Sequence, residues 1–311
     1  MGIDLHTANF LLAARTYWGV SFRSTATIGH QHLHVAPDAL RRLLGKFGIP
    51  PSQTLAELEA ACGNFADPFF RYLGAEEIVS LDASEYENAT VIHDMNLPIL
   101  SELKRRFDVV YDGGSLEHIF NFPVAVRNCM ELVRVDGHFL GANPTNNWCG
   151  HGFYQFSPEL YFRVFSSDNG FVVDHAMLYD SAARWYEVED PKEVRQRVLF
   201  ASSLPVTLLV LARRTREVPL FSATPQQSDY SIVWGGEQLA DSTPVHESAI
   251  KEIVKQLVAK IERHLPASEA LFGRIRNYRY RRGVASAQMS GLHSPFLQPV
   301  SDLRDVVDHR R

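Results

Sequence analysis

The stretch Phe107–Pro123, FDVVYDGGSLEHIFNFP, decides the fold expected of this chain. It begins with an apolar run that stops at a carboxylate, Asp112, and two glycines follow at once. A carboxylate and an imidazole, Glu117 and His118, come shortly afterwards. In open parallel sheets, ligands bind at the carboxyl ends of the strands, where such side chains gather. The stretch therefore predicts a strand over 107–111 with a ligand site at its end.

Outward from this strand, short β-rich runs alternate with helical segments from about residue 24 to residue 214, a pattern typical of α/β proteins. The early connections are long enough for parallel crossovers. We therefore expect a mostly parallel, seven-stranded sheet. Its strands are predicted over 24–35, 77–81, 90–92, 107–111, 137–142, 170–178 and 204–212.

The character of the sequence changes after Arg214. Residues 215–245 are rich in Ser, Pro, Gln and Gly, which predicts an irregular linker or flap. Residues 246–311 are expected to form a helical C-terminal extension, because apolar side chains recur at helical spacing from Ile250 to Leu265. The chain thus divides into a main domain over 1–214, a linker and an appendage.

The composition indicates a globular protein without a general affinity for polyanions. With 311 residues, 45% of them hydrophobic, the chain can fill a sizeable core. Its formal net charge is -5, so neither nucleic acid nor an anionic membrane is expected as a partner. Cys62, Cys129 and Cys149 are odd in number and far apart, which predicts neither a disulfide framework nor a zinc knuckle. We expect a cytoplasmic protein, since no signal peptide and no apolar run of bilayer length is seen.

The order of strands and carboxylates resembles the class I S-adenosylmethionine-dependent methyltransferases over roughly residues 24 to 214. The segment DGGSLEH, which starts at Asp112, is similar to their small-molecule branch. The resemblance implies an α/β, Rossmann-like fold with a helical C-terminal appendage, and S-adenosylmethionine as the cofactor. It also implies a small-molecule or sugar-derived acceptor of the methyl group; homo-oligomerisation is left open.

The resemblance assigns roles to particular residues of this chain. Asp82, after the second strand, would hold the ribose hydroxyls of the cofactor. Asp94, after the third strand, would lie near the adenine, with Met95 packed beside it. The amino-acid end of the cofactor is implied to lie over Asp112, Gly113 and Gly114.

The glycine loop of that family, G-x-G-x-G after the first strand, does not occur in this sequence. One candidate for its position is TIGHQ, where Gly29 stands alone. The other is ACGNF around Gly63, whose distance to Asp82 suits the family but whose preceding segment has the composition of a helix. We favour TIGHQ as the end of the first strand, with an inserted helical excursion before Glu77.

Methyl transfer often needs a base that removes the acceptor's proton, and two histidines are candidates. His118 is the imidazole nearest to the predicted transfer point. The loop over 143–160, rich in amides and aromatic rings, offers His151 as a second base and Tyr154 as a group that orients the acceptor. Both assignments have a plainer alternative, in which His118 is a packing or capping residue and the loop amides bond to their own backbone.

Two further groups of residues could bind ligands, a set of histidines and a basic segment. His30, His32 and His34 alternate and would share one face of a strand, but their spread makes binding of one ion difficult, so no metal is expected. The basic segment over 274–282 could grip phosphate, although a solvated helix is the commoner interpretation. A non-catalytic, Rossmann-like binding or scaffold protein is the alternative to a methyltransferase, because the glycine loop is missing.

Overall fold

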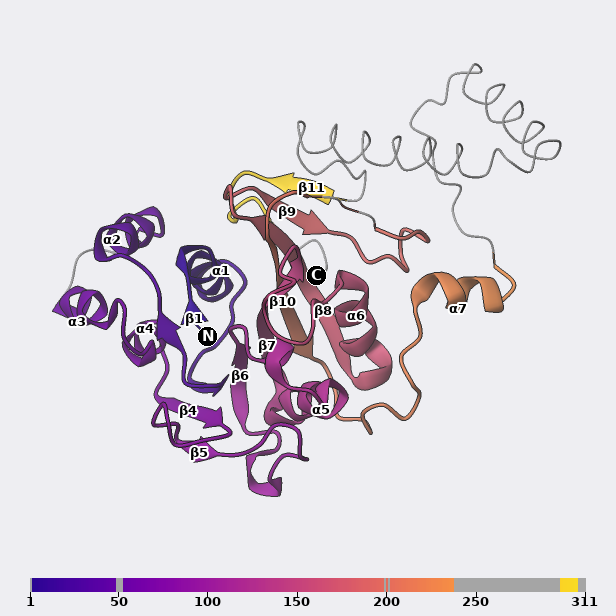
Figure 1. Ribbon diagram of the computed structural model, residues 1–311, viewed down its shortest axis with the longest axis horizontal. Helices are drawn as coiled ribbons and strands as arrows, with labels where there is room; N and C mark the ends of the chain where they lie inside the picture. The colour runs from indigo at the N-terminus through magenta and orange to yellow at the C-terminus, as the bar shows by residue number, and fades with distance from the viewer. Residues whose placement is uncertain (1, 49–52, 199, 201, 238–296, 307–311) are drawn as a thin grey trace, which may run out of the picture.

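The structure is a computed structural model that describes residues 2–48, 53–198, 200, 202–237 and 297–306. Within these residues a large mixed sheet forms the centre of the molecule, with helices on both faces (Figure 1). In spatial order its strands are β11 (Leu297–Val300), β9 (Trp185–Val188), β8 (Phe171–Asp180), β10 (Val206–Arg214), β7 (Val133–Asn146), β6 (Phe107–Asp112), β2 (Ser24–Ile28), β4 (Glu77–Asp82) and β5 (Val91–Ile92). The α/β class expected from the sequence is confirmed.

The expected strand count and direction need correction. All seven predicted strands are present, but the sheet has nine strands and is mixed. The strands β5, β4, β2, β6 and β7 run parallel to one another, whereas β10 pairs antiparallel with β7, and β8, β9 and β11 continue the sheet in antiparallel pairs. The two additional strands, β9 and β11, have four residues each, too short for an alternating pattern to stand out in the sequence.

Two hydrophobic clusters pack against the two faces of the sheet. One contains α5 (Phe122–Leu132) and α6 (Pro158–Val164), and the other contains α1 (Leu5–Thr16), α2 (Pro37–Lys46) and α4 (Asp67–Tyr72). All six residues of β6 are buried, because side chains from both clusters cover it. Burial on both faces is the reason why this strand reads as a nearly continuous apolar run.

The helical excursion after the first strand of the sheet is confirmed. β2 ends at Ile28, immediately before Gly29, and the segment TIGHQ is therefore the strand end that the sequence favoured. The helices α2, α3 (Gln53–Ala61) and α4 lie between β2 and β4. Gly63, the rejected candidate, follows α3 in a turn with φ of +79°.

Helix ends follow local rules of capping. The carboxylate of Asp4 accepts a hydrogen bond from the Thr7 amide at 2.7 Å and caps α1, a helix that the sequence analysis did not predict. Ser157 caps α6 by accepting from the Leu160 amide, and Pro158 occupies the first turn. A small parallel pair, β1 (Gly2–Ile3) and β3 (His32–Leu33), ties the N-terminal segment beside α1.

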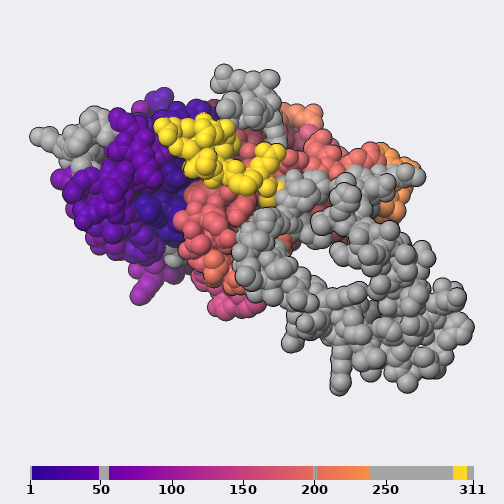
Figure 2. Space-filling view, turned by 90° about the horizontal axis from the view of Figure 1, so that it is seen from above, coloured from indigo at the N-terminus to yellow at the C-terminus, as the bar shows by residue number. Residues whose placement is uncertain are grey.

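The segment over 297–306 lies on the surface between the N-terminal part and the antiparallel half of the sheet, where Figure 2 shows it in yellow. β11 pairs with β9, and the indole nitrogen of Trp18 donates to the Val306 carbonyl at 3.1 Å. The predicted stripe from Ile250 to Leu265 and the basic segment over 274–282 lie outside the described residues. A short helix, α7 (Ser228–Trp234), occurs within the predicted linker. The domain boundaries stay a prediction.

The remaining short elements are the 3-10 turns η1 (Ser101–Leu103), η2 (Leu116–His118) and η3 (Ser167–Asn169). In the part of the chain that the structure describes, every helix is too short or too polar to cross a membrane.

We expect the stability of the fold to depend on pH through His138 in β7. Its imidazole is buried, and this burial lowers its pKa from 6.5 to about 4. The unfolded chain therefore takes up this proton at a higher pH than the folded chain. The free energy of unfolding should fall by up to about 3 kcal/mol as the pH drops from 6.5 to 4.

Urea denaturation across this pH range checks the expectation against a His138→Gln variant. The variant should lose this part of the pH dependence, whatever its stability at pH 7. An unchanged slope in the variant would show that other groups cause the dependence.

Candidate functional site

The registers of three parallel strands place the predicted binding residues at one edge of the sheet. Ile28 of β2 pairs with Leu81 of β4 on one side and with Asp112 of β6 on the other. The next residues along these strands, Gly29, Asp82 and Gly113, therefore follow in one row. The chain leaves β2 toward β4 on one side and returns to β6 on the other, so this row is the switch point at which open α/β sheets bind ligands.

Glycines allow close approaches of the chain at this edge of the sheet. Gly29 has φ of +75°, and its amide donates to the Leu81 carbonyl at 2.6 Å, which closes the end of β2 against β4. At Gly113 a Cβ atom would lie 2.3 Å from Oε1 of Gln31, so no larger residue fits without displacing this side chain. Gly114, with φ of +85°, turns the chain from β6 into η2.

Asp82 is the accessible carboxylate of the row. Its side chain is partly exposed, and one oxygen accepts from the Ser84 amide at 3.3 Å. Among the described residues, the second oxygen has no hydrogen-bond partner. Asp82 can therefore accept hydrogen bonds from a ligand without breaking a bond within the protein.

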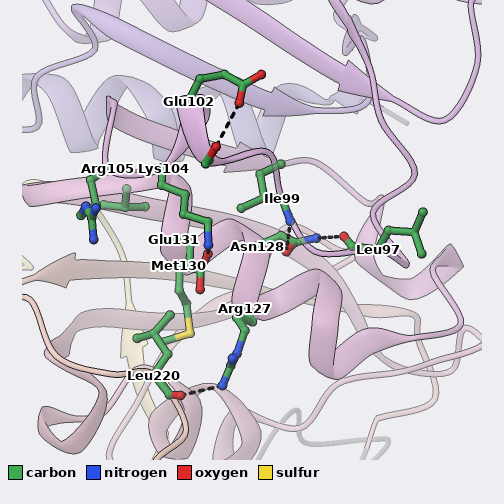
Figure 3. Close-up of polar contacts among 12 residues, drawn as sticks. Leu97, Ile99, Glu102, Lys104, Arg105, Arg127, Asn128, Met130, Glu131 and Leu220 are labelled. Carbon is green, nitrogen blue, oxygen red and sulfur yellow. Dashed lines mark hydrogen bonds and ion pairs between the residues drawn. The ribbon is translucent and has the colours of Figure 1, made fainter.

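The loop after β5 holds Asp94 and Met95 in different environments. The exposed Asp94 carboxylate accepts from the Asn96 amide at 2.9 Å and from its side chain at 2.7 Å, and the backbone bond in particular lowers its pKa. Met95 is buried in the core. Asn128 of α5 fixes the rest of the loop: its side chain accepts from the Ile99 amide and donates to the Leu97 carbonyl (Figure 3).

Asp112 is fully buried and bonds within the protein. One carboxylate oxygen accepts from the amides of Ser115 and Leu116, at 2.9 and 3.3 Å. The other oxygen accepts from Nδ2 of Asn143 at 2.6 Å. The same Nδ2 donates to Glu117 Oε2 at 3.1 Å. One amide group of β7 therefore bridges two buried carboxylates.

The bridge is held from its other side. Oδ1 of Asn143 accepts from the hydroxyl of Tyr161, a buried residue of α6, at 2.5 Å. This bond leaves the Asn143 amide nitrogen facing the two carboxylates. Asp112, Glu117, Asn143 and Tyr161 form one hydrogen-bond network, called the carboxylate network below.

Burial alters the protonation of the network. Removal from water, and then the charge of Glu117, raise the pKa of Asp112 from 3.8 to about 7. Burial likewise raises the pKa of Glu117. Two carboxylates that share one donor in a dry site titrate as a pair.

The structure brings His118 and His151 together. Their ring centroids are 4.8 Å apart, edge to face, and His151 Nε2 lies 3.4 Å from Glu117 Oε1. Burial, followed by the nearby His151, lowers the pKa of His118. The hydroxyl of Tyr154 donates to the Phe120 carbonyl at 2.7 Å, so this residue lies beside the pair but is bonded to backbone.

Backbone contacts fix the loop that carries His151. The amide of Phe153 donates to the Glu117 carbonyl at 2.7 Å, and the Tyr154 amide donates to it at 3.3 Å. At Gly152, with φ of +73°, a Cβ atom would lie 2.7 Å from the same carbonyl. Only glycine permits this close approach.

The plainer alternative holds for part of the loop. Asn147 donates to the carbonyls of Ser202 and Leu204, and Gln155 accepts from the Trp148 amide at 2.8 Å. These amides satisfy backbone groups. Asn143 lies within β7 and belongs to the carboxylate network.

The three alternating histidines do not converge on one point. His30 contacts Asp67 and the Glu87 carbonyl and stacks on Phe65. His32 lies 5.7 Å from His34, measured between ring centroids.

Sequence reasoning missed Gln31 and Tyr161. Gln31 is buried beside Gly113, and its Oε1 has no hydrogen-bond partner among the described residues. Its proximity in sequence to Gly29 could have marked it as part of the site. No local signal marks Tyr161, because its partner Asn143 lies on another element.

Known proteins resemble the chain only in structure. No family model and no curated protein matches its sequence. Solved structures that resemble it include an S-adenosylmethionine-dependent methyltransferase from Mesorhizobium loti, with 14% identity and a TM-score of 0.36, over 67% of this chain and 98% of that one. The branched-chain polyamine synthase from Thermus thermophilus is also similar, with 14% identity and a TM-score of 0.35, over 71% of this chain and 59% of that one.

The predicted resemblance to methyltransferases is thus found among solved structures. With identities under 25% and TM-scores under 0.5, these similarities carry no argument about the activity of this chain.

We expect Asn143→Ala to destabilise the protein strongly. The substitution leaves Asp112 and Glu117 buried without their shared donor, which should cost about 2–4 kcal/mol in the free energy of unfolding. Urea denaturation at pH 7.5 measures the loss. The matched control is Asn146→Ala at the end of the same strand, a partly buried side chain with no hydrogen bond among the described residues, whose cost should stay below about 1 kcal/mol. Equal losses for the two variants would contradict the bridging role.

Proposed function

We propose that this chain is an S-adenosylmethionine-dependent methyltransferase that acts on a small-molecule or sugar-derived acceptor. The observation that carries the proposal is the row Gly29, Asp82 and Gly113 at the switch point of the sheet. It combines a carboxylate with positions where backbone can approach a ligand closely. Carboxylates bind paired ribose hydroxyls well, because they accept two hydrogen bonds at once.

The residues present fit two polar parts of this cofactor, its ribose and its amino-acid group. For the ribose hydroxyls, Asp82 offers an oxygen that bonds to no described residue. For the amino-acid group, Oε1 of Gln31 is a buried acceptor without a partner among the described residues, next to Gly113. The ammonium group of an amino acid is a donor that would satisfy it.

When bound, S-adenosylmethionine would supply a methyl group on a sulfonium for transfer to an acceptor atom. The chain's own part is to hold the acceptor and take its proton. His118 and His151 are exposed beside the buried Glu117, and the lowered pKa of His118 favours its neutral form, which can accept a proton. The loop over 143–160, held against Glu117 by the Phe153 and Tyr154 amides, would cover the acceptor and exclude water.

A non-catalytic role is not favoured. The exposed imidazoles of His118 and His151 beside Glu117 are groups that binding the cofactor alone would not need.

The cofactor assignment predicts a defined loss of affinity in Asp82→Ala. Calorimetric titration of S-adenosylhomocysteine into the full chain should show binding, and the variant should raise the Kd about 10–100-fold. This range corresponds to the loss of about 1.5–3 kcal/mol in charge-assisted hydrogen bonds.

The control for this titration is Glu85→Ala, an exposed carboxylate in the loop that follows β4, which should bind like the wild type. Absence of binding to a well-folded wild type would remove the proposal. Unchanged affinity in Asp82→Ala would remove the ribose assignment.

A further inference from the structure

The geometry points to a divalent transition-metal site formed by Glu117, His118 and His151, at the edge of the sheet where the acceptor is proposed to bind. Each of these residues offers one ligand atom, and the three atoms lie within 4.8 Å of one another. The sequence predicted no metal, since His118 and His151 come from different segments. The three residues are called the His–Glu cluster below.

The spacing suits a zinc-like ion. Two ligands at 2.0–2.1 Å from a tetrahedral ion lie about 3.4 Å apart. The separation between Glu117 Oε1 and His151 Nε2 is 3.4 Å. The ligand atom of His118 lies within 4.8 Å of the other two, and its side chain is exposed, so it would have to move closer to complete the site. Imidazole nitrogens with one carboxylate are ligands that zinc, cobalt and iron accept.

The carboxylate is oriented before any ion arrives. Oε2 of Glu117 accepts from Asn143, which Tyr161 holds in turn, so Oε1 faces the imidazoles. Outer hydrogen bonds of this kind orient metal ligands in known sites. Backbone bonds from Phe153 and Tyr154 to the Glu117 carbonyl clamp the His151 loop against the same residue. The cluster is therefore preorganised on its carboxylate side.

Charge also favours a cation. The partners that the structure gives to the buried carboxylates of Asp112 and Glu117 are Ser115, Leu116, Asn143 and His151, none of which is Arg or Lys. A bound cation would supply the missing countercharge. Because His151 is 47% exposed, water or a ligand can complete the coordination.

If the chain is the methyltransferase proposed above, such an ion would bind an acceptor hydroxyl and favour its loss of a proton, in place of the role as base given above to the two imidazoles. Metal binding itself does not depend on that function. It is tested with metal alone, so that either proposal can fail without the other.

The experiment is titration of cobalt(II) into the EDTA-treated, desalted full chain, followed by visible absorption and then by displacement with zinc(II). One cobalt ion per chain is expected, with the intense absorption of a four-coordinate site that zinc removes. His151→Ala and Glu117→Gln should each weaken binding about 100-fold or more, since outer-shell changes alone cost 10–100-fold. His118→Ala should weaken it by at least about tenfold.

Gly152→Ala tests the positioning of the loop without removing a ligand. It should weaken cobalt binding about tenfold or more, because the added methyl group displaces the loop from the Glu117 carbonyl. Circular dichroism of each variant in EDTA verifies folding; His151 is an exposed loop residue, so its variant should remain folded.

The matched control is His34→Ala, which removes one ring of another histidine pair next to a glutamate, His32 and His34 beside Glu87. This variant should bind cobalt like the wild type. Two results would each overturn the proposal: no cobalt absorption in the wild type, or wild-type cobalt binding by His151→Ala.

Discussion

The bridge from Asn143 to Asp112 and Glu117 is the interaction on which the site depends. Two carboxylates buried beside each other repel, and each needs a donor because water cannot reach it. A single amide nitrogen supplies both bonds and thereby joins the end of β6, the turn η2 and β7. Tyr161 extends the junction to α6. This arrangement also sets the direction in which Glu117 presents its second carboxylate oxygen, Oε1, toward His151.

Much of the fold could be predicted, because its signals are local. Runs of β-branched residues, a proline or serine at a helix start and the glycine after Ile28 each act within a few residues. They located all seven strands that were expected and the inserted helices before β4. Burial of β6 on both faces made its segment the clearest of these signals. Because the ends of β2, β4 and β6 could be located in the sequence, Gly29, Asp82 and Gly113 could be placed at one edge of the sheet.

The remainder depends on contacts between distant residues. Asn143 is 26 residues from Glu117 in sequence, and Tyr161 is 18 residues from Asn143, so no spacing rule connects them. The sequence could suggest His118 and His151 separately, but only the fold of the loop brings their rings together. The strands β9 and β11 could not be predicted because a strand of four residues has almost no pattern of its own.

The late strand β11 has a consequence for how the chain reaches its final state. Its Gln298 contacts Glu189, 109 residues earlier, and the segment that follows it reaches back 288 residues to Trp18. Contacts of such sequence separation close a long loop and form late in folding. Until they form, β9 is an unprotected edge, with free backbone groups that can pair with another chain. During synthesis, the antiparallel half of this molecule is therefore the part most exposed to aggregation, until β11 pairs with β9.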